Sequence, residues 1–61
     1  MTLKRVPIEK IRRGSIIYCG EEYGFQEAVH IYKTEEGGEI IMMSGLRMVL
    51  KPNDLVERVK Y

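Results

Sequence analysis

The chain has 61 residues, with ten Lys and Arg against nine Asp and Glu and a net charge of +1. At this length, residues 1–61 are expected to fold as one domain, which buries only about 60% of the surface that the unfolded chain exposes. With one cysteine, Cys19, and one histidine, His30, the composition excludes an intramolecular disulfide and an ordinary zinc site. The lone thiol, the absence of a long apolar run and the absence of a secretory leader pattern favour a cytoplasmic protein without a membrane segment.

Short structural segments follow one another from the N-terminal side. Residues 7–13 are expected to form one or two turns of helix, because Pro7 suits the first helical position and Gly14 the left-handed exit. Residues 15–19 are rich in β-branched side chains and lie between two glycines, which is typical of a strand. These features predict a helical turn that leads directly into the first strand.

A second strand is expected over residues 26–34, where apolar and polar side chains alternate. Val29 and Ile31 would lie on one face of this strand, and His30 and Tyr32 on the other. The pattern therefore predicts a half-buried strand with one face toward the core.

The remaining segments predict a hairpin and a closing strand. The Gly-Gly pair in residues 35–38 favours a tight hairpin, and residues 39–43 are apolar on both faces, as in a central strand. Residues 46–50 alternate again and predict a fourth strand. Residues 52–55 are expected to form a one-turn helix before a fifth strand. A full C-terminal helix on a three- to four-stranded sheet is the alternative.

This order of elements resembles that of Src-homology-three-like small β-barrels. The resemblance depends on the opening turn and strand at residues 13–17, the hairpin at residues 35–38 and the turn at residues 51–55. It implies a mostly β fold, a five-stranded antiparallel barrel. Peptide-binding members have an aromatic floor that includes a tryptophan, and this chain has no tryptophan. The resemblance therefore does not extend to binding of proline-rich peptides.

An acidic loop with aromatic residues is the first candidate for protein binding. It contains Glu21, Glu22, Tyr23 and Phe25. Carboxylates and aromatic rings together suit a basic peptide, through charge-assisted hydrogen bonds and cation–π contacts. The alternative is that Tyr18 and Phe25 belong to the core and that the glutamates only keep the loop soluble.

An apolar stripe on the predicted central strand is the second candidate. If Ile40 and Met42 face the core, Ile41 and Met43 face outward. Such a stripe is a liability in a monomer, and it favours a partner, either a second copy or another protein. The alternative is that the methionines are ordinary core residues.

Basic residues gather toward the two ends of the sequence, and they give a different hypothesis. If the two ends lie side by side, they form a patch that tracks the phosphates of a nucleic acid. The alternative is a solvated, salt-bridged surface. The candidate residues are Lys4, Arg5, Lys10, Arg12, Arg13, Arg58 and Lys60.

The sequence contains no motif of an enzyme, and Ser15 and Ser44 lack the surroundings of a catalytic nucleophile. We therefore expect no catalytic activity, no cofactor, no metal and no small-molecule substrate. The sequence favours an interaction module that binds another protein or itself, of the size that phages and plasmids encode to modulate a host factor. Nucleic-acid binding by the basic ends is the alternative.

Overall fold

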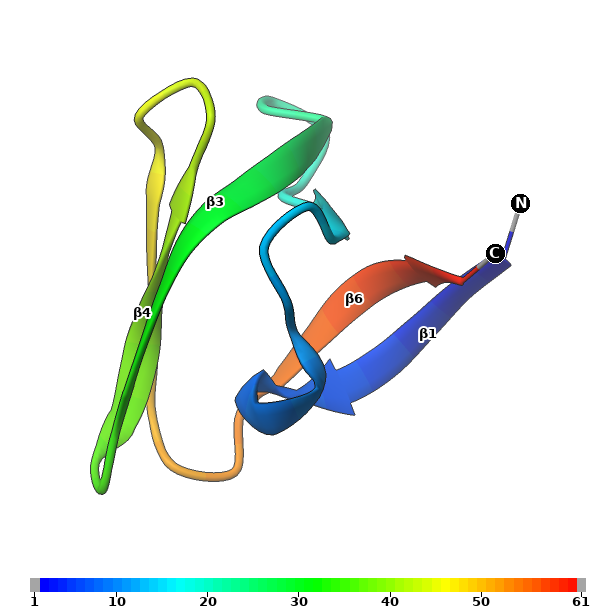
Figure 1. Ribbon diagram of the computed structural model, residues 1–61. Coiled ribbons are helices and arrows are strands. Elements are labelled where there is room, and N and C mark those ends of the chain that lie inside the picture. The colour runs from blue at the N-terminus through cyan, green and yellow to red at the C-terminus, as the bar shows by residue number, and fades with distance from the viewer. Residues whose placement is uncertain (1, 61) are drawn as a thin grey trace.

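The computed structural model describes residues 2–60, and in this part of the chain it has six strands and one short helix (Figure 1). The helix is a single 3-10 turn, and no helix of the described residues is long and apolar enough to cross a membrane. The elements are β1 (Thr2–Pro7), η1 (Ile8–Lys10), β2 (Ile16–Tyr18), β3 (Phe25–Thr34), β4 (Gly37–Met42), β5 (Arg47–Leu50) and β6 (Leu55–Lys60).

All six strands belong to one antiparallel sheet with the order β1-β6-β2-β3-β4-β5. Within the described residues, β1 and β5 are its two edges and do not pair with each other, so the hydrogen-bonded sheet is open. The prediction of a mostly β fold is confirmed. The sequence predicts five strands, and the sixth is β1, in which Val6 is the only fully buried side chain. One buried side chain gives no alternation from which a strand can be predicted.

The predicted helix at residues 7–13 is only the short turn η1. The chain leaves the helical conformation at Ile11, which has φ −88° and ψ 136°. Both Ile8 and Ile11 are buried in the core. The turn is therefore held by packing of these two isoleucines and not by helix length.

The predicted closing strand is confirmed as β6, but the helical turn expected at residues 52–55 is not present. Residues 51–54 form a tight turn in which the Asp54 N–H donates to the Lys51 carbonyl at 3.1 Å. Asn53 has a φ of 71°, in the left-handed region, which interrupts any helix started at Pro52. The next residues form β6, which pairs with β1 on one side and β2 on the other. The alternative of a C-terminal helix is wrong, because it would leave β1 without its partner.

A β-bulge divides β3 between Ala28 and His30. Ala28 is fully buried and Ile31 packs against the core, while His30 and Tyr32 are exposed, as predicted. Val29 was expected beside Ile31, but it is the extra residue at the bulge and lies half-buried. A bulge shifts the alternation by one residue, so strict counting places Val29 incorrectly.

The core lies between the two halves of the curved sheet, and in the described residues it contains no buried polar or charged side chain. Ile17, Ile40 and Met42 are its largest fully buried side chains. The prediction that Ile40 and Met42 face the core is confirmed. The buried cluster consists of Val6, Ile8, Ile11, Ile17, Ala28, Ile40, Met42, Leu50 and Val56.

The predicted hairpin joins β3 to β4, with Thr34 paired to Gly37. The two glycines have φ values of 119° and 155°, and they start β4 instead of forming the tip of the turn. A Cβ atom on Gly37 would collide with the carbonyl oxygen of Leu50, on β5. Gly37 is thus required both for its backbone conformation and for the close approach of the neighbouring strand.

Candidate functional site

The outward side of β3, β4 and β5 carries two rows of aligned side chains. Tyr32 lies opposite Glu39, which lies opposite Val49. In the next row, His30 lies opposite Ile41, which lies opposite Arg47. Directly opposite side chains in a sheet lie within contact distance of one another. The register therefore assembles residues from three strands into one surface.

This surface combines apolar and aromatic side chains with the charged pair Glu39 and Arg47, and it is open to solvent. Tyr32 is 54% exposed, Met43 is 66% exposed and Val49 is 71% exposed. The rings of His30 and Tyr32 stack with their centroids 6.1 Å apart. Ile41 lies half-buried at the centre. We call this surface the outer face and define it by His30, Tyr32, Ile41, Met43 and Val49.

The charged groups within the outer face neutralise each other. The Arg47 Nε donates to the Glu39 Oε1 at 2.8 Å, across β4 and β5. The Arg47 side chain is 65% exposed, so this pair adds little to stability. Its consequence is a surface without net charge, which is suited to an apolar contact and not to a polyanion.

Met43 was expected to be the last residue of the central strand, and it lies one residue beyond β4, in the turn to β5. Its N–H donates to the Glu27 carbonyl on β3 at 2.8 Å. Met43 is thus held beside β3 although it is outside the strand. Phe25 is two residues from Glu27 on β3, so the outer face adjoins the acidic aromatic loop.

The acidic aromatic loop is an ordered connection between β2 and β3. The Cys19 N–H donates to the Gly24 carbonyl at 2.8 Å, and the Gln26 amide donates to the Tyr23 carbonyl at 2.9 Å. The Phe25 ring lies against Tyr18 at a centroid distance of 5.1 Å. Both Phe25 and Tyr23 are half-exposed and lie outside the core, and Glu21 and Glu22 are exposed.

The basic ends of the sequence are brought together by the pairing of β1 with β6. Lys4 lies opposite Arg58, and Lys60 lies opposite Thr2. Arg5 lies opposite Glu57, on the other side of the two strands. The two-strand ribbon thus carries basic side chains from both ends of the sequence on one side.

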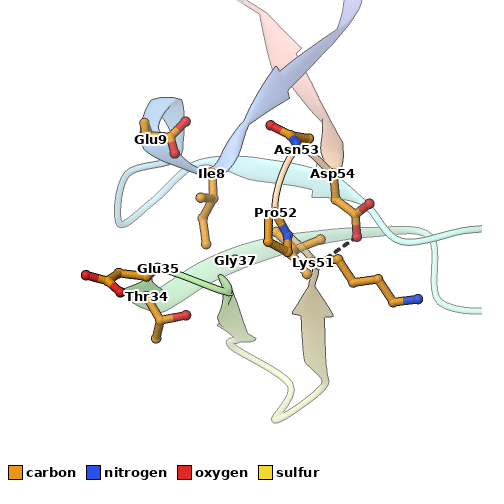
Figure 2. Close-up of a pocket in the computed structure, with 10 residues that line it drawn as sticks. Ile8, Glu9, Thr34, Glu35, Gly37, Lys51, Pro52, Asn53 and Asp54 are labelled. Carbon is orange, nitrogen blue, oxygen red and sulfur yellow. Dashed lines mark hydrogen bonds between the residues drawn. The ribbon is translucent and has the colours of Figure 1, made fainter.

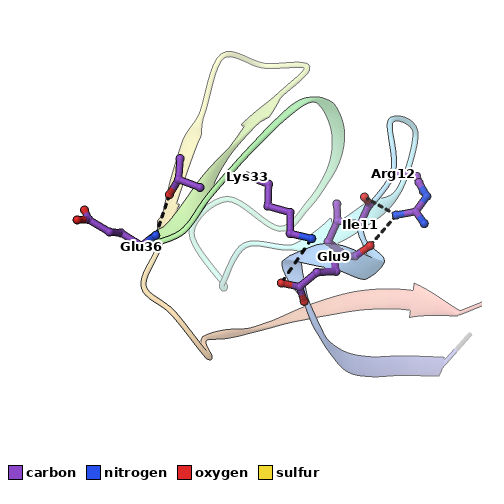
Figure 3. A network of polar contacts seen from close by, with 6 residues as sticks. Glu9, Ile11, Arg12, Lys33 and Glu36 are labelled. Carbon is purple, nitrogen blue, oxygen red and sulfur yellow. Dashed lines mark hydrogen bonds and ion pairs between the residues drawn. The ribbon is translucent and has the colours of Figure 1, made fainter.

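The remaining basic candidates lie around η1. The Arg12 guanidinium donates to the Glu9 carbonyl at 2.7 Å and to the Ile11 carbonyl at 3.3 Å (Figure 3). Glu9 also faces Lys33 of β3, with 3.9 Å between Nζ and Oε1. Lys10 ends η1, and Arg13 is exposed in the loop that follows. These residues continue the basic side of the ribbon onto the neighbouring loop.

A shallow hollow lies where η1, the β3–β4 hairpin and the turn at residues 51–54 meet (Figure 2). Its volume is about 220 Å³, below the roughly 300–1,000 Å³ of typical ligand pockets. Asp54 accepts a hydrogen bond from the Lys51 N–H at 2.8 Å, so its carboxylate stabilises the turn at residues 51–54. We interpret the hollow as a junction of structural elements.

The thiol of Cys19 is half-buried and donates a weak hydrogen bond to the Ile17 carbonyl at 3.7 Å. Burial raises the pKa of the Cys19 thiol above its ordinary value. Since the thiolate is the reactive form, the folded protein should react with iodoacetamide at pH 8 more slowly than the chain unfolded in urea. The difference should shrink as the pH rises through the raised pKa. Faster labelling of the folded protein would show an activated thiol instead.

Three members of the outer face are absent from the predicted protein-binding residues: His30, Tyr32 and Val49. The alternation of residues 46–50 could have identified Val49. It places Arg47 and Val49 on one face of the strand and Met48 and Leu50 on the other. That His30, Tyr32 and Val49 lie on a single surface follows only from the register of three strands.

Searches for related proteins found no matching family model, no matching curated protein and no matching solved structure. Between residues 2 and 60, no three His, Cys, Asp or Glu side chains are grouped so that they could hold a metal ion.

Proposed function

We propose that the chain is a non-catalytic interaction module that binds another protein through its outer face. One observation supports the proposal: Tyr32 and Val49 are each more than half exposed on one side of the sheet, and Met43 is exposed in the turn that follows β4. Contiguous apolar patches of this kind on a small domain mark interaction sites. The free thiol agrees with a reducing, cytoplasmic location, and the strand order agrees with a Src-homology-three-like arrangement.

The chemistry of the outer face favours a protein as the partner. Tyr32 supplies a large amphipathic ring of the kind that dominates binding energy in protein interfaces. Met43 adapts to irregular apolar surfaces. The paired charges of Glu39 and Arg47 leave the face neutral, so it offers nothing that attracts a polyanion.

The size of the outer face predicts a transient complex. A stable interface buries about 800 Å² on each partner, and the whole described chain exposes 4498 Å². Five side chains cover less than a standard interface. Contacts from Tyr23 and Phe25 in the neighbouring loop would extend the surface, and the acidic Glu21 and Glu22 would favour a partner with basic residues at its rim.

The proposal is tested with matched variants in affinity capture from the source cell, followed by titration of the purified partner. Tyr32→Ser combined with Val49→Ser should weaken binding at least about tenfold, because truncation of central anchors typically costs 1–2 kcal/mol or more. Leu55→Ser, which removes an exposed aliphatic side chain elsewhere on the sheet, is the control and should bind like wild type.

Sedimentation velocity at two concentrations shows whether the partner is a second copy of the chain. If it is, the double variant should weaken self-association and Leu55→Ser should not. A partner that binds the double variant as tightly as wild type would contradict the proposal. So would a chain that stays monomeric and captures nothing. Circular dichroism of each variant confirms that binding is compared between folded proteins.

A further inference from the structure

The charges of the chain are segregated along the fold. Residues 2–13 and 55–60 together hold seven basic and two acidic side chains, a net charge of +5. Residues 14–54 hold three basic and seven acidic side chains, a net charge of −4. Figure 1 shows that β1 and β6 lie together on one side of the molecule, apart from the hairpin of β3 and β4, and η1 lies between this ribbon and the hairpin. One side of the molecule is therefore strongly basic, although the net charge of the whole chain is only +1.

Like charges face each other within this basic side. Lys4 lies directly opposite Arg58, and Lys60 lies one pair further along the same side of the ribbon. Like charges placed opposite each other in a sheet destabilise the strand pair. Glu57 does not relieve this repulsion, because it lies opposite Arg5 on the other side of the two strands. A bound anion would relieve it.

Two of the guanidinium groups are held in place by backbone carbonyls. Arg58 donates from Nη1 to the Lys10 carbonyl at 2.8 Å. Arg12 donates to the carbonyls of Glu9 and Ile11, on either side of Lys10. Three successive carbonyls thus position two guanidinium groups close together. Each guanidinium has five N–H donors, so most of them stay available to an anion at little further entropic cost.

We propose that this side of the molecule binds the phosphate backbone of a nucleic acid. Lys4, Arg12, Arg58 and Lys60 are its phosphate contacts. The cations are spread along two strands and the adjacent loop, which suits a repeating polyanion better than a single phosphate group. The site lies on other strands than the outer face, so the proposal stands independently of the proposed function.

The mode of binding follows from the same residues. Basic side chains that contact phosphates position a nucleic acid without reading its bases. The net negative charge of residues 14–54 restricts the contact to one side of the protein. Binding should therefore be independent of sequence and strongly dependent on salt.

The test is fluorescence anisotropy of a labelled duplex of mixed sequence, and of its single strand, in 25 to 200 mM KCl. Four phosphate contacts predict a slope of log K against log salt of about −3.6 for the duplex and about −2.8 for the single strand. Removal of two contacts by Lys4→Gln with Lys60→Gln should reduce the duplex slope by about 2. The same variant should weaken binding at low salt roughly tenfold or more.

The matched control is Arg47→Gln with Lys51→Gln, which removes the same charge from exposed positions on β5 and in the turn that follows it. At 100 mM KCl its affinity should stay within about twofold of wild type, because the Debye length is then about 10 Å and phosphate contacts act locally. Equal losses in the two double variants would overturn the proposal. Absence of binding at 25 mM KCl, or binding only to vesicles of an anionic phospholipid, would overturn it as well.

Discussion

Gly37→Ala is expected to remove about half or more of the free energy of unfolding of the chain. The added Cβ would collide with the Leu50 carbonyl oxygen, which belongs to the backbone of the neighbouring strand and cannot move alone. The φ of 119° at Gly37 adds backbone strain for any residue with a side chain. A domain of this length has a free energy of unfolding of roughly 3–9 kcal/mol. The substitution should cost about 4 kcal/mol or more, in the range reserved for severe core defects.

Gly45→Ala is the matched control for this experiment. Gly45 also has a positive φ, 96°, but no heavy atom lies within 4 Å of the position of an added Cβ. Only the strain of the left-handed conformation remains, about 1–2 kcal/mol. Urea unfolding followed by circular dichroism compares the two variants. Equal losses of stability would contradict the close approach of Gly37 to β5.

The adjacent residues Met42 and Met43 should respond very differently to truncation. Met42 is fully buried, so Met42→Ala leaves a cavity and should cost about 2–5 kcal/mol. Met43 is exposed and lies beyond the strand, so Met43→Ala should change the free energy of unfolding by no more than about 0.5 kcal/mol.

Chemical denaturation of the two methionine variants gives the comparison, provided that the slope of free energy against denaturant is unchanged. A large loss of stability in Met43→Ala would contradict its exposed position. The stable Met43→Ala variant is then suited to binding experiments, because any loss of partner affinity would come from the outer face alone.

Local patterns were sufficient to predict the central part of the fold. A period of two groups Ile40 with Met42 and Ile41 with Met43, so the two faces of β4 follow from the sequence, while the choice of the buried face comes from packing against the neighbouring strands. The Gly-Gly pair marks the place of the hairpin, although Glu35 and Glu36 form its tip and the two glycines begin β4. Both inferences depend only on residues close together in the chain.

β1 was not predicted because the reason for its conformation lies at the far end of the chain. Its residues from Thr2 to Arg5 are exposed, and their strand conformation comes from pairing with β6. The segment that forms the turn at residues 51–54 was predicted to be helical at residues 52–55. Proline suits both structures, since it is common at the first position of a helix and at the second residue of a β-turn. Asn53 decides between them, since it adopts the left-handed conformation more readily than most residues.

The candidate surfaces were only partly predictable, because two of them bring together residues that are distant in the sequence. The acidic aromatic loop is continuous in sequence, so its residues were found together. The outer face needs the register between Tyr32, Ile41 and Val49, which lie on three strands. The sequence predicted one basic surface from the two ends only if these ends lie side by side. The pairing of Lys4 with Arg58 shows that they do.

The position of β6 between β1 and β2 has a consequence for synthesis on the ribosome. β1 is made early, yet among the described residues it pairs only with β6, which is made last. Until residues 55–60 leave the exit tunnel, β1 has no partner and β2 lacks one of its neighbours. Sheets joined by such distant segments fold slowly, on a scale of roughly milliseconds to seconds. The domain therefore completes its fold only after residues 55–60 have emerged, and the nascent chain carries unpaired strand edges until then.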